Sequence, residues 1–215
     1  LLGRRRIAAI SASPETRSSV NSQRQGRGFE ADWGWRARMS RLIAARMDQD
    51  SRETRDATPL AEVKERIAKA AAPAGRRAED VTLIAISKTH AAEAIRPLLE
   101  QGQRHFGENR VQEAEGKWPE LRADYPDVTL HLVGQLQSNK AGQAVALFDV
   151  IHSLDRPSLV AALGQEMERQ GRHIPCFVQV NIGDEPQKGG CAIADLPGLL
   201  ATAREAGIPV AGLMC

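Results

Sequence analysis

Several polar side chains directly follow short apolar segments, an arrangement that places reactive groups at the ends of strands. Lys88 follows one such segment, Asn109 follows a second, and His152 and Ser153 lie at the end of a third. Asn181 lies near the end of a fourth. In parallel α/β folds, groups at the carboxyl ends of strands meet on one face, so these residues are candidates for a common site.

Lys88 carries the strongest nucleophile of this set. If its ammonium group is partly removed from water, more of it exists as the free amine, which can attack an aldehyde such as pyridoxal phosphate or a sugar. The alternative is a solvated lysine that only closes a strand. Lysines are mostly exposed, so position alone favours that alternative.

The other polar residues also have structural alternatives. Asn109 precedes a helical pattern that starts near Val111, and asparagine is a common helix cap, so local pattern favours capping. His131 lies inside an apolar segment, where a hydrogen-bonded core histidine is the commoner outcome, whereas His152 lies nearer a segment end. The five histidines show no H-x-x-x-H or H-E-x-x-H spacing, and no metal is expected.

Strand-like and helix-like patterns alternate through most of the chain. The strand-like segments are 81–87, 104–107, 129–134, 149–154, 176–182 and 209–214. The helical patterns are 91–101, 111–122, 141–148, 157–170 and 194–206, after a first helix that begins at Thr58-Pro59 and ends near Pro73. The strands follow one another at roughly 20 to 28 residues, the spacing of a βαβ unit.

This alternation predicts an α/β fold of the (β/α)8 TIM-barrel type. A dinucleotide-binding sheet is less favoured, because no G-x-G-x-x-G follows the first strand. A closed barrel needs eight strands, and the pattern gives about six βα units. We therefore expect a barrel domain over 58–215 that is truncated at the C-terminus, with a six-stranded open sheet as the alternative.

Composition excludes several classes of protein. The 215 residues include 29 Lys and Arg against 27 Asp and Glu, and 42% are hydrophobic. No uninterrupted apolar run of eighteen residues occurs, so no transmembrane helix and no membrane partner are expected. The chain has three cysteines, an odd number, and they show no C-x-x-C spacing. A disulfide framework is therefore not expected, which favours a reducing, cytoplasmic compartment. A monomer is expected.

Residues 1–57 form a separate, Arg-rich leader that we expect to be disordered. Residues 1–60 hold twelve Arg against seven acidic residues, which leaves 17 basic and 20 acidic residues in 61–215. The leader is interpreted as a transit peptide, a nucleic-acid arm or non-native upstream sequence. The last is favoured because Met39 and Met47 precede the first helix. No nucleic-acid partner is expected, because no aromatic-studded strand pattern follows.

Six motifs stand in order along the chain. They are ISKT at 86–89, FGENRVQE at 106–113, HLVGQLQSNK at 131–140, IHSLD at 151–155, VNI at 180–182 with KGG at 188–190, and GLM at 212–214. Together they closely resemble the pyridoxal phosphate homeostasis proteins, small relatives of the alanine racemase N-terminal barrel. The resemblance covers about residues 60–215 and rests on all six motifs, since no one of them is specific alone.

The resemblance implies a barrel that binds pyridoxal 5'-phosphate, with Lys88 holding this cofactor as an internal aldimine. Asn109 and Met214 would lie near its ring, and the outer candidates are His152, Ser153 and Asn181. The implied function is intracellular pyridoxal phosphate homeostasis as a cofactor carrier and regulator, without catalysis. The alternative is a pyridoxal phosphate-dependent enzyme such as an amino-acid racemase.

Two further expectations follow from the resemblance. Racemases of the related type pair their lysine with a tyrosine base, and the single tyrosine here, Tyr125, lies in a polar loop. The family holds the cofactor phosphate with an M-G-M-S segment and an R-x-G-T type segment, and neither occurs in the 215 residues. We therefore expect this chain to bind pyridoxal phosphate weakly, because charge-assisted hydrogen bonds to a phosphate are strong.

Overall fold

A computed structural model describes residues 58–183, 185 and 187–215 of the chain. The predictions for the leader at 1–57 lie outside the described residues. The chain divides into two units, one of which includes residues up to Ala78 and the other residues from Glu79 to Cys215. Each unit is described by itself.

In the first unit, helix α2 (Pro59–Ala71) is the predicted first helix. Its start follows from the Thr58-Pro59 pair, because the Thr58 side chain accepts a hydrogen bond from the Ala61 N–H at 3.3 Å and Pro59 has a fixed φ. A short 3₁₀ helix, η1 (Ala72–Ala74), follows, and Gly75 at φ 63° ends it. Only glycine adopts that backbone angle without strain.

The second unit is built on one parallel sheet. Its strands are β1 (Ala85–Ile86), β2 (His105–Glu108), β3 (Thr129–Leu132), β4 (Val150–Leu154), β5 (Cys176–Gln179) and β6 (Val210–Met214). They pair in the order β1-β2-β3-β4-β5-β6, so each strand lies beside its neighbour in sequence. Every pairing is parallel. This is the strand order of a (β/α) barrel, and it confirms the predicted α/β class.

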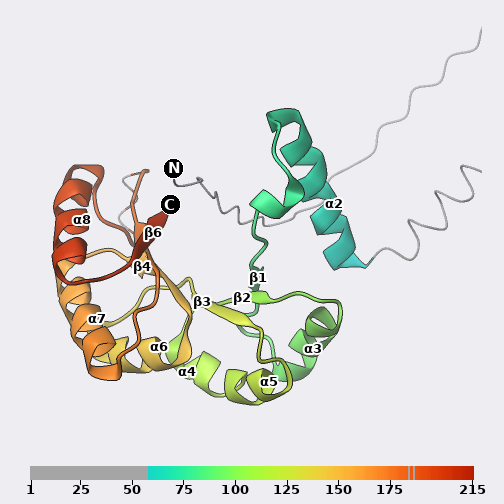
Figure 1. Ribbon diagram of the computed structural model, residues 1–215, viewed down its shortest axis with the longest axis horizontal. Coiled ribbons are helices and arrows are strands. Elements are labelled where there is room, and N and C mark those ends of the chain that lie inside the picture. The colour runs from blue at the N-terminus through green and yellow to red at the C-terminus, as the bar shows by residue number, and fades with distance from the viewer. Residues whose placement is uncertain (1–57, 184, 186) are drawn as a thin grey trace, which may run out of the picture. The chain divides into compact units, whose positions relative to one another are not determined.

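Helices connect these strands and cover one side of the sheet, as Figure 1 shows for the second unit. They are α3 (Ala92–Glu100), α4 (Val111–Glu115), α5 (Trp118–Asp124), α6 (Ala141–Leu147), α7 (Pro157–Gln170) and α8 (Leu196–Glu205). Short 3₁₀ turns are η2 (Ala78–Asp80), η3 (Ser138–Lys140) and η4 (Ile193–Asp195). The side of the sheet without these helices is called the concave face below.

Three predicted segments differ from the structure. The single helix predicted at 111–122 is two helices, because Pro119 has no N–H and its ring would clash with the carbonyl one turn earlier. The strand predicted at 81–87 is only β1, which pairs with β2 alone. The strand predicted at 176–182 ends at Gln179, after which Val180 forms an isolated bridge with Cys191.

The core lies between the sheet and its helices. Phe106 of β2 packs on Trp118 of α5 with ring centroids 5.2 Å apart, and both are fully buried. At the amino ends of the strands, Asp149 forms ion pairs with Arg122 and Arg172 and accepts a hydrogen bond from the Leu130 N–H. Apolar packing therefore holds the helices on the sheet, and an ion cluster closes one end.

This packing predicts how two leucine substitutions differ. Leu163 of α7 is 0% exposed and Leu213 of β6 is 57% exposed. We expect Leu163→Ala to lower the free energy of unfolding by about 2 to 5 kcal/mol because it leaves a cavity. Leu213→Ala should lower it by less than about 1 kcal/mol, because little surface is buried there. Chemical denaturation measures both, and equal losses would contradict the described packing.

Candidate functional site

Lys88 lies in the turn that follows β1. A Cβ placed on Gly107 would lie 2.7 Å from the Ile86 side chain, so Ile86 and position 107 share one face. Lys88 and Asn109 each come two residues later, just after the paired strands β1 and β2. The Lys88 side chain is exposed and Asn109 is half-buried. The structure thus brings the first two predicted site residues to one end of neighbouring strands.

The turn that carries Lys88 is held by two side chains from the helix layer. Lys117 donates from Nζ to the carbonyl oxygens of Ser87 at 2.8 Å and His90 at 2.9 Å. Glu113 accepts a hydrogen bond from the backbone N–H of Thr89. That hydrogen bond, assisted by Lys117, lowers the pKa of the Glu113 carboxyl group. The Ser87 carbonyl, just before Lys88, and the His90 carbonyl, just after Thr89, therefore both accept hydrogen bonds from Lys117.

Glu108 lies directly behind this turn, on the helix side of the sheet. Its carboxylate is fully buried, and Oε1 accepts hydrogen bonds from Ser87 Oγ at 2.5 Å and from Trp118 Nε1 at 3.0 Å. Lys117 Nζ lies 3.0 Å from the same oxygen. Such partners offset the cost of burying a carboxylate. The Ser87 hydroxyl is thereby fixed toward Glu108 and the helices.

Asn109 does not cap a helix, so the capping interpretation is wrong. The N-cap residue of α4 is Arg110, and no side chain makes a cap hydrogen bond there. The backbone of Asn109 is instead crowded by the next loop. A Cβ on Gly134 would lie 2.3 Å from the Asn109 carbonyl oxygen, so only glycine allows this close approach.

A row of three histidines crosses the concave face. His105 Nδ1 lies 3.1 Å from His131 Nε2, and His131 Nδ1 lies 2.9 Å from His152 Nε2. His152 also stacks on Phe177, with ring centroids 4.6 Å apart. Burial lowers the pKa of His131 to about 3, with the neighbouring histidines adding to the effect, and burial lowers the pKa of His152 to about 4. Both imidazoles are therefore neutral near pH 7.

The remaining predicted residues are placed differently from one another. Met214 is half-buried and pairs in register with Gln179 at the carboxyl end of β6. The Asn181 carboxamide is engaged, since it bonds both the N–H and the carbonyl of Glu185. Ser153 alternates with His152 and faces the helices, fully buried, with its Oγ lacking a hydrogen-bond partner. The structure does not bring Ser153 to the concave face.

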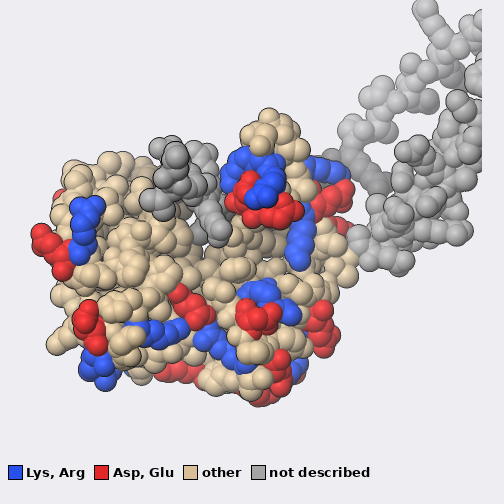
Figure 2. Space-filling view, in the orientation of Figure 1, with Lys and Arg blue, Asp and Glu red and all other residues tan. Residues whose placement is uncertain are grey.

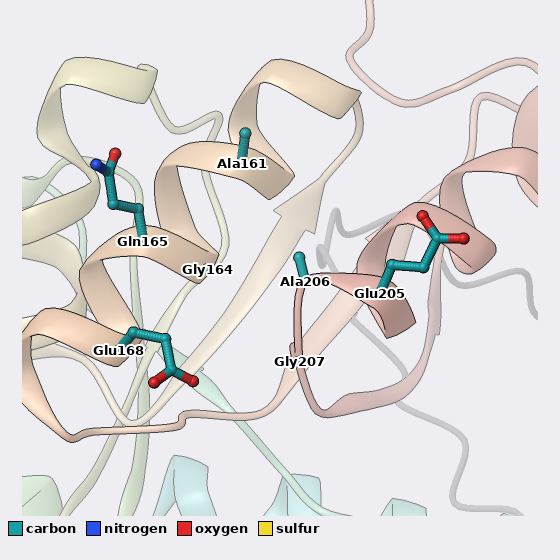
Figure 3. Close-up of a pocket in the computed structure, with 7 residues that line it drawn as sticks. All are labelled: Ala161, Gly164, Gln165, Glu168, Glu205, Ala206 and Gly207. Carbon is teal, nitrogen blue, oxygen red and sulfur yellow. The ribbon is translucent and has the colours of Figure 1, made fainter.

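A groove elsewhere on this unit does not coincide with the candidate site. It lies between the carboxyl ends of α7 and α8, and Figure 3 shows Gln165 and Glu168 on one side and Glu205 on the other. The strands that follow these helices, β5 and β6, begin near that end. The groove therefore lies near the end of the sheet opposite Lys88.

Charge and ligand patterns bear on other kinds of site. On the face in Figure 2, the described acidic and basic side chains are interspersed, with no continuous basic surface among them. Within residues 58–183, 185 and 187–215, His, Cys, Asp and Glu form no group of three that could hold a metal ion. None of the helices in the described part of the chain has the length and apolar character needed to cross a bilayer.

Comparisons with known proteins agree with this geometry. The family model for the alanine racemase N-terminal domain matches residues 60–215. The chain belongs to that family. A pyridoxal phosphate homeostasis protein from Escherichia coli K12 is 37% identical over 147 residues, which cover 68% of this chain and 63% of the relative. The resemblance predicted from the six motifs is confirmed.

Solved structures are also similar to this chain. The structure of PipY from Synechococcus elongatus with pyridoxal phosphate bound is 43% identical, with a TM-score of 0.58 over 69% of each chain. An alanine racemase of Clostridium difficile has a TM-score of 0.51 over 63% of this chain and 35% of its own, at 13% identity, which shows likeness of fold alone. The chain spans about 63% of the length of the Escherichia coli relative.

Three residues in and after the second motif have roles that the sequence did not reveal. Glu108 lies at the end of the second predicted strand, and Glu113 and Lys117 lie in the helical pattern at 111–122. The spacing of Glu113 and Lys117, four residues apart, is a signal for an ion pair. Nothing in that spacing indicates that the pair reaches a turn at residues 87–90.

The histidine row predicts a pH dependence of stability for this family member. In the unfolded chain both histidines have a pKa near 6.5, whereas the folded values are lower, so protons bind the unfolded state first. The stabilisation that comes from these two neutral histidines is thus fully present above pH 6.5, and it is lost as the pH falls toward 4. Each histidine contributes a slope of about 1.4 kcal/mol per pH unit in that window.

Denaturation midpoints between pH 8 and pH 4 measure this slope. His131→Gln should flatten it, because one of the two buried imidazoles is removed. His173→Gln is the matched control for the loss of a histidine outside the buried row, since His173 is 43% exposed, and His131→Gln should flatten the slope more than this control does. Imidazole NMR signals of His131 or His152 that titrate near pH 6.5 in the folded protein would show that the burial argument is wrong.

Proposed function

We propose that the chain binds pyridoxal 5'-phosphate through Lys88 and serves intracellular pyridoxal phosphate homeostasis as a carrier and regulator. The observation that carries this proposal is the exposed Lys88 at the carboxyl end of β1, on a turn fixed by the helix layer. Membership in the alanine racemase N-terminal domain family supports it. A relative solved with the cofactor bound supports it further.

The types of residue present support binding of such a cofactor. The cofactor supplies an aldehyde, which a lysine amine can capture covalently with loss of water. Lys88 offers that amine at the open end of the concave face. Asn109, on the neighbouring strand, offers a half-buried carboxamide for a polar ring substituent, and half-buried Met214 offers an apolar surface for the ring itself. His152 lies deeper on the same face, and Asn181 shapes the loop after β5.

We propose that this role is binding rather than catalysis. A racemase removes a proton on one side of its substrate and delivers one on the other, so two groups must flank the cofactor. Tyr125 follows α5 and precedes β3, and its ring lies under the Arg104 guanidinium, 5.7 Å away. It therefore lies at the amino end of the strands, away from Lys88. This placement supports a binding protein over a racemase.

We also propose that the protein works as a monomer in a reducing, cytoplasmic compartment. Cys176 and Cys191 are buried and unpaired, and burial raises the pKa of the Cys176 thiol to about 12. A thiol in that state is unreactive and forms no disulfide. Sedimentation of the chain at several concentrations would test the monomer, and a mass that rises with concentration would contradict it.

Reductive trapping tests the cofactor proposal. The chain is incubated with pyridoxal phosphate, reduced with borohydride and mapped by peptide mass spectrometry. We expect the pyridoxyl group on Lys88, and its loss from that peptide in Lys88→Arg, because a guanidinium does not condense with the aldehyde. Lys140→Arg, which changes a lysine after β3, should retain the label on Lys88. A label spread evenly over the lysines, or absent, would refute the proposal.

An assay for racemisation tests the distinction between binding and catalysis. The chain with pyridoxal phosphate is incubated with L-alanine, and the enantiomers are separated by chiral chromatography. Because Tyr125 lies at the other end of the sheet, we expect no D-alanine above the level given by free pyridoxal phosphate. D-alanine that forms with the chain and disappears in Tyr125→Phe would overturn the proposed non-catalytic role.

A further inference from the structure

We propose that Lys117 and Glu113 are positioning residues, which hold the turn at Ser87–His90 so that the Lys88 amine faces the open end of the sheet. The inference rests on the proposed function only for what the amine binds. It assigns a task to an ion pair that otherwise resembles the many Glu–Lys pairs found along helices.

Lys117 is unusual because it is a lysine with almost no exposure. Its side chain is 9% exposed, and it stands in the break between α4 and α5 that Pro119 causes. From that break its ammonium reaches across to β1 and donates to the carbonyls of Ser87 and His90. These carbonyls bracket Lys88 and Thr89. The break places Lys117 at the N-cap of α5, and from there its side chain reaches the turn after β1.

Glu113 contacts the turn from the same side as Lys117. We call these two residues, with their hydrogen bonds to the turn, the clamp. Its Oε1 accepts from the Thr89 N–H and lies 3.2 Å from Lys117 Nζ. Thr89 has φ 64°, the left-handed region, which a β-branched residue avoids unless its surroundings hold it there. The hydrogen bond to Glu113 supplies that hold. The strained angle turns the chain sharply just after Lys88.

Glu108 fixes the other side of the turn and pairs with Lys117. Its buried carboxylate binds Ser87 Oγ and Trp118 Nε1, and Lys117 provides the compensating positive charge. An apolar pair of the same size would often stabilise a fold as well or better. The ionic network instead specifies one backbone geometry. All its contacts are made by residues around Lys88, and none by the Lys88 amine.

The test compares two variants of the clamp with a matched control. Glu113→Ala removes the acceptor for Thr89, and Lys117→Met removes both carbonyl contacts while keeping the length of the side chain. Lys69→Met is the control, because Lys69 forms a pair of the same spacing with Glu65 on the surface of α2. Amide hydrogen exchange of Thr89 reports the turn. Pyridoxyl labelling of Lys88 reports the amine, and the unfolding midpoint reports global stability.

In Glu113→Ala we expect Thr89 exchange to rise about tenfold, the effect of one lost hydrogen bond of ordinary strength. Labelling of Lys88 should fall at least about fivefold, while exchange of the core amide of Leu163 stays unchanged. Glu113→Gln, which keeps an acceptor oxygen, should restore most of the labelling. The control should match the unsubstituted chain in all three measurements.

Two results would overturn the inference. The first is unchanged Thr89 exchange in Glu113→Ala, and the second is faster exchange with undiminished labelling, which would make the clamp purely structural. If Lys117→Met fails to fold, Glu113→Ala and Glu113→Gln decide the matter. If the unsubstituted chain is not labelled on Lys88 while Thr89 exchange responds as expected, the proposed cofactor role fails and the clamp stands.

Discussion

The carboxylate of Glu108 lies where no water reaches it, between the sheet and its helices, and the ammonium of Lys117 compensates its charge. Breaking a buried pair of this kind typically costs several kcal/mol, because one charge is left without a partner. The pair therefore constrains the residues that contact it. It requires the break between α4 and α5, and it fixes Ser87 toward the helices.

From that constraint the rest of the candidate site follows by geometry. The Ser87 hydroxyl is held on the helix side of the sheet, and Lys88 follows it in the turn after β1. Asn109 lies at the same end of the neighbouring strand β2. Because all six strands are parallel, their carboxyl ends lie at the same end of the sheet. Below that end of the sheet, His105, His131 and His152 form a row of hydrogen-bonded rings, in which His131 and His152 are neutral near pH 7. The site therefore combines a rigid base with an exposed amine.

The sequence predicted the order and type of the elements, because hydrophobic periodicity and spacing determine them locally. Helix α7 was predicted with its observed bounds, since Pro157 and Gly171 are strong start and stop signals. The single helix predicted at 111–122 was wrong because Pro119 cannot continue a helix that started at Val111. The Lys117 clamp could not be predicted, since it joins residues about thirty positions apart whose contact depends on that break. Ser153 directly follows His152 in β4, so alternation allows only one of the two on the concave face. The sequence did not determine which one, because that depends on how β4 packs on the helices.

The most direct test is a crystal structure of the chain after reduction with pyridoxal phosphate. Density should run without interruption from Lys88 Nζ into the pyridoxyl ring, with Asn109 beside it. In the same map, Lys117 Nζ should lie between the carbonyl oxygens of Ser87 and His90. Density for the ring on another lysine, or a Lys117 side chain turned toward solvent with the Lys88 turn unchanged, would contradict the account.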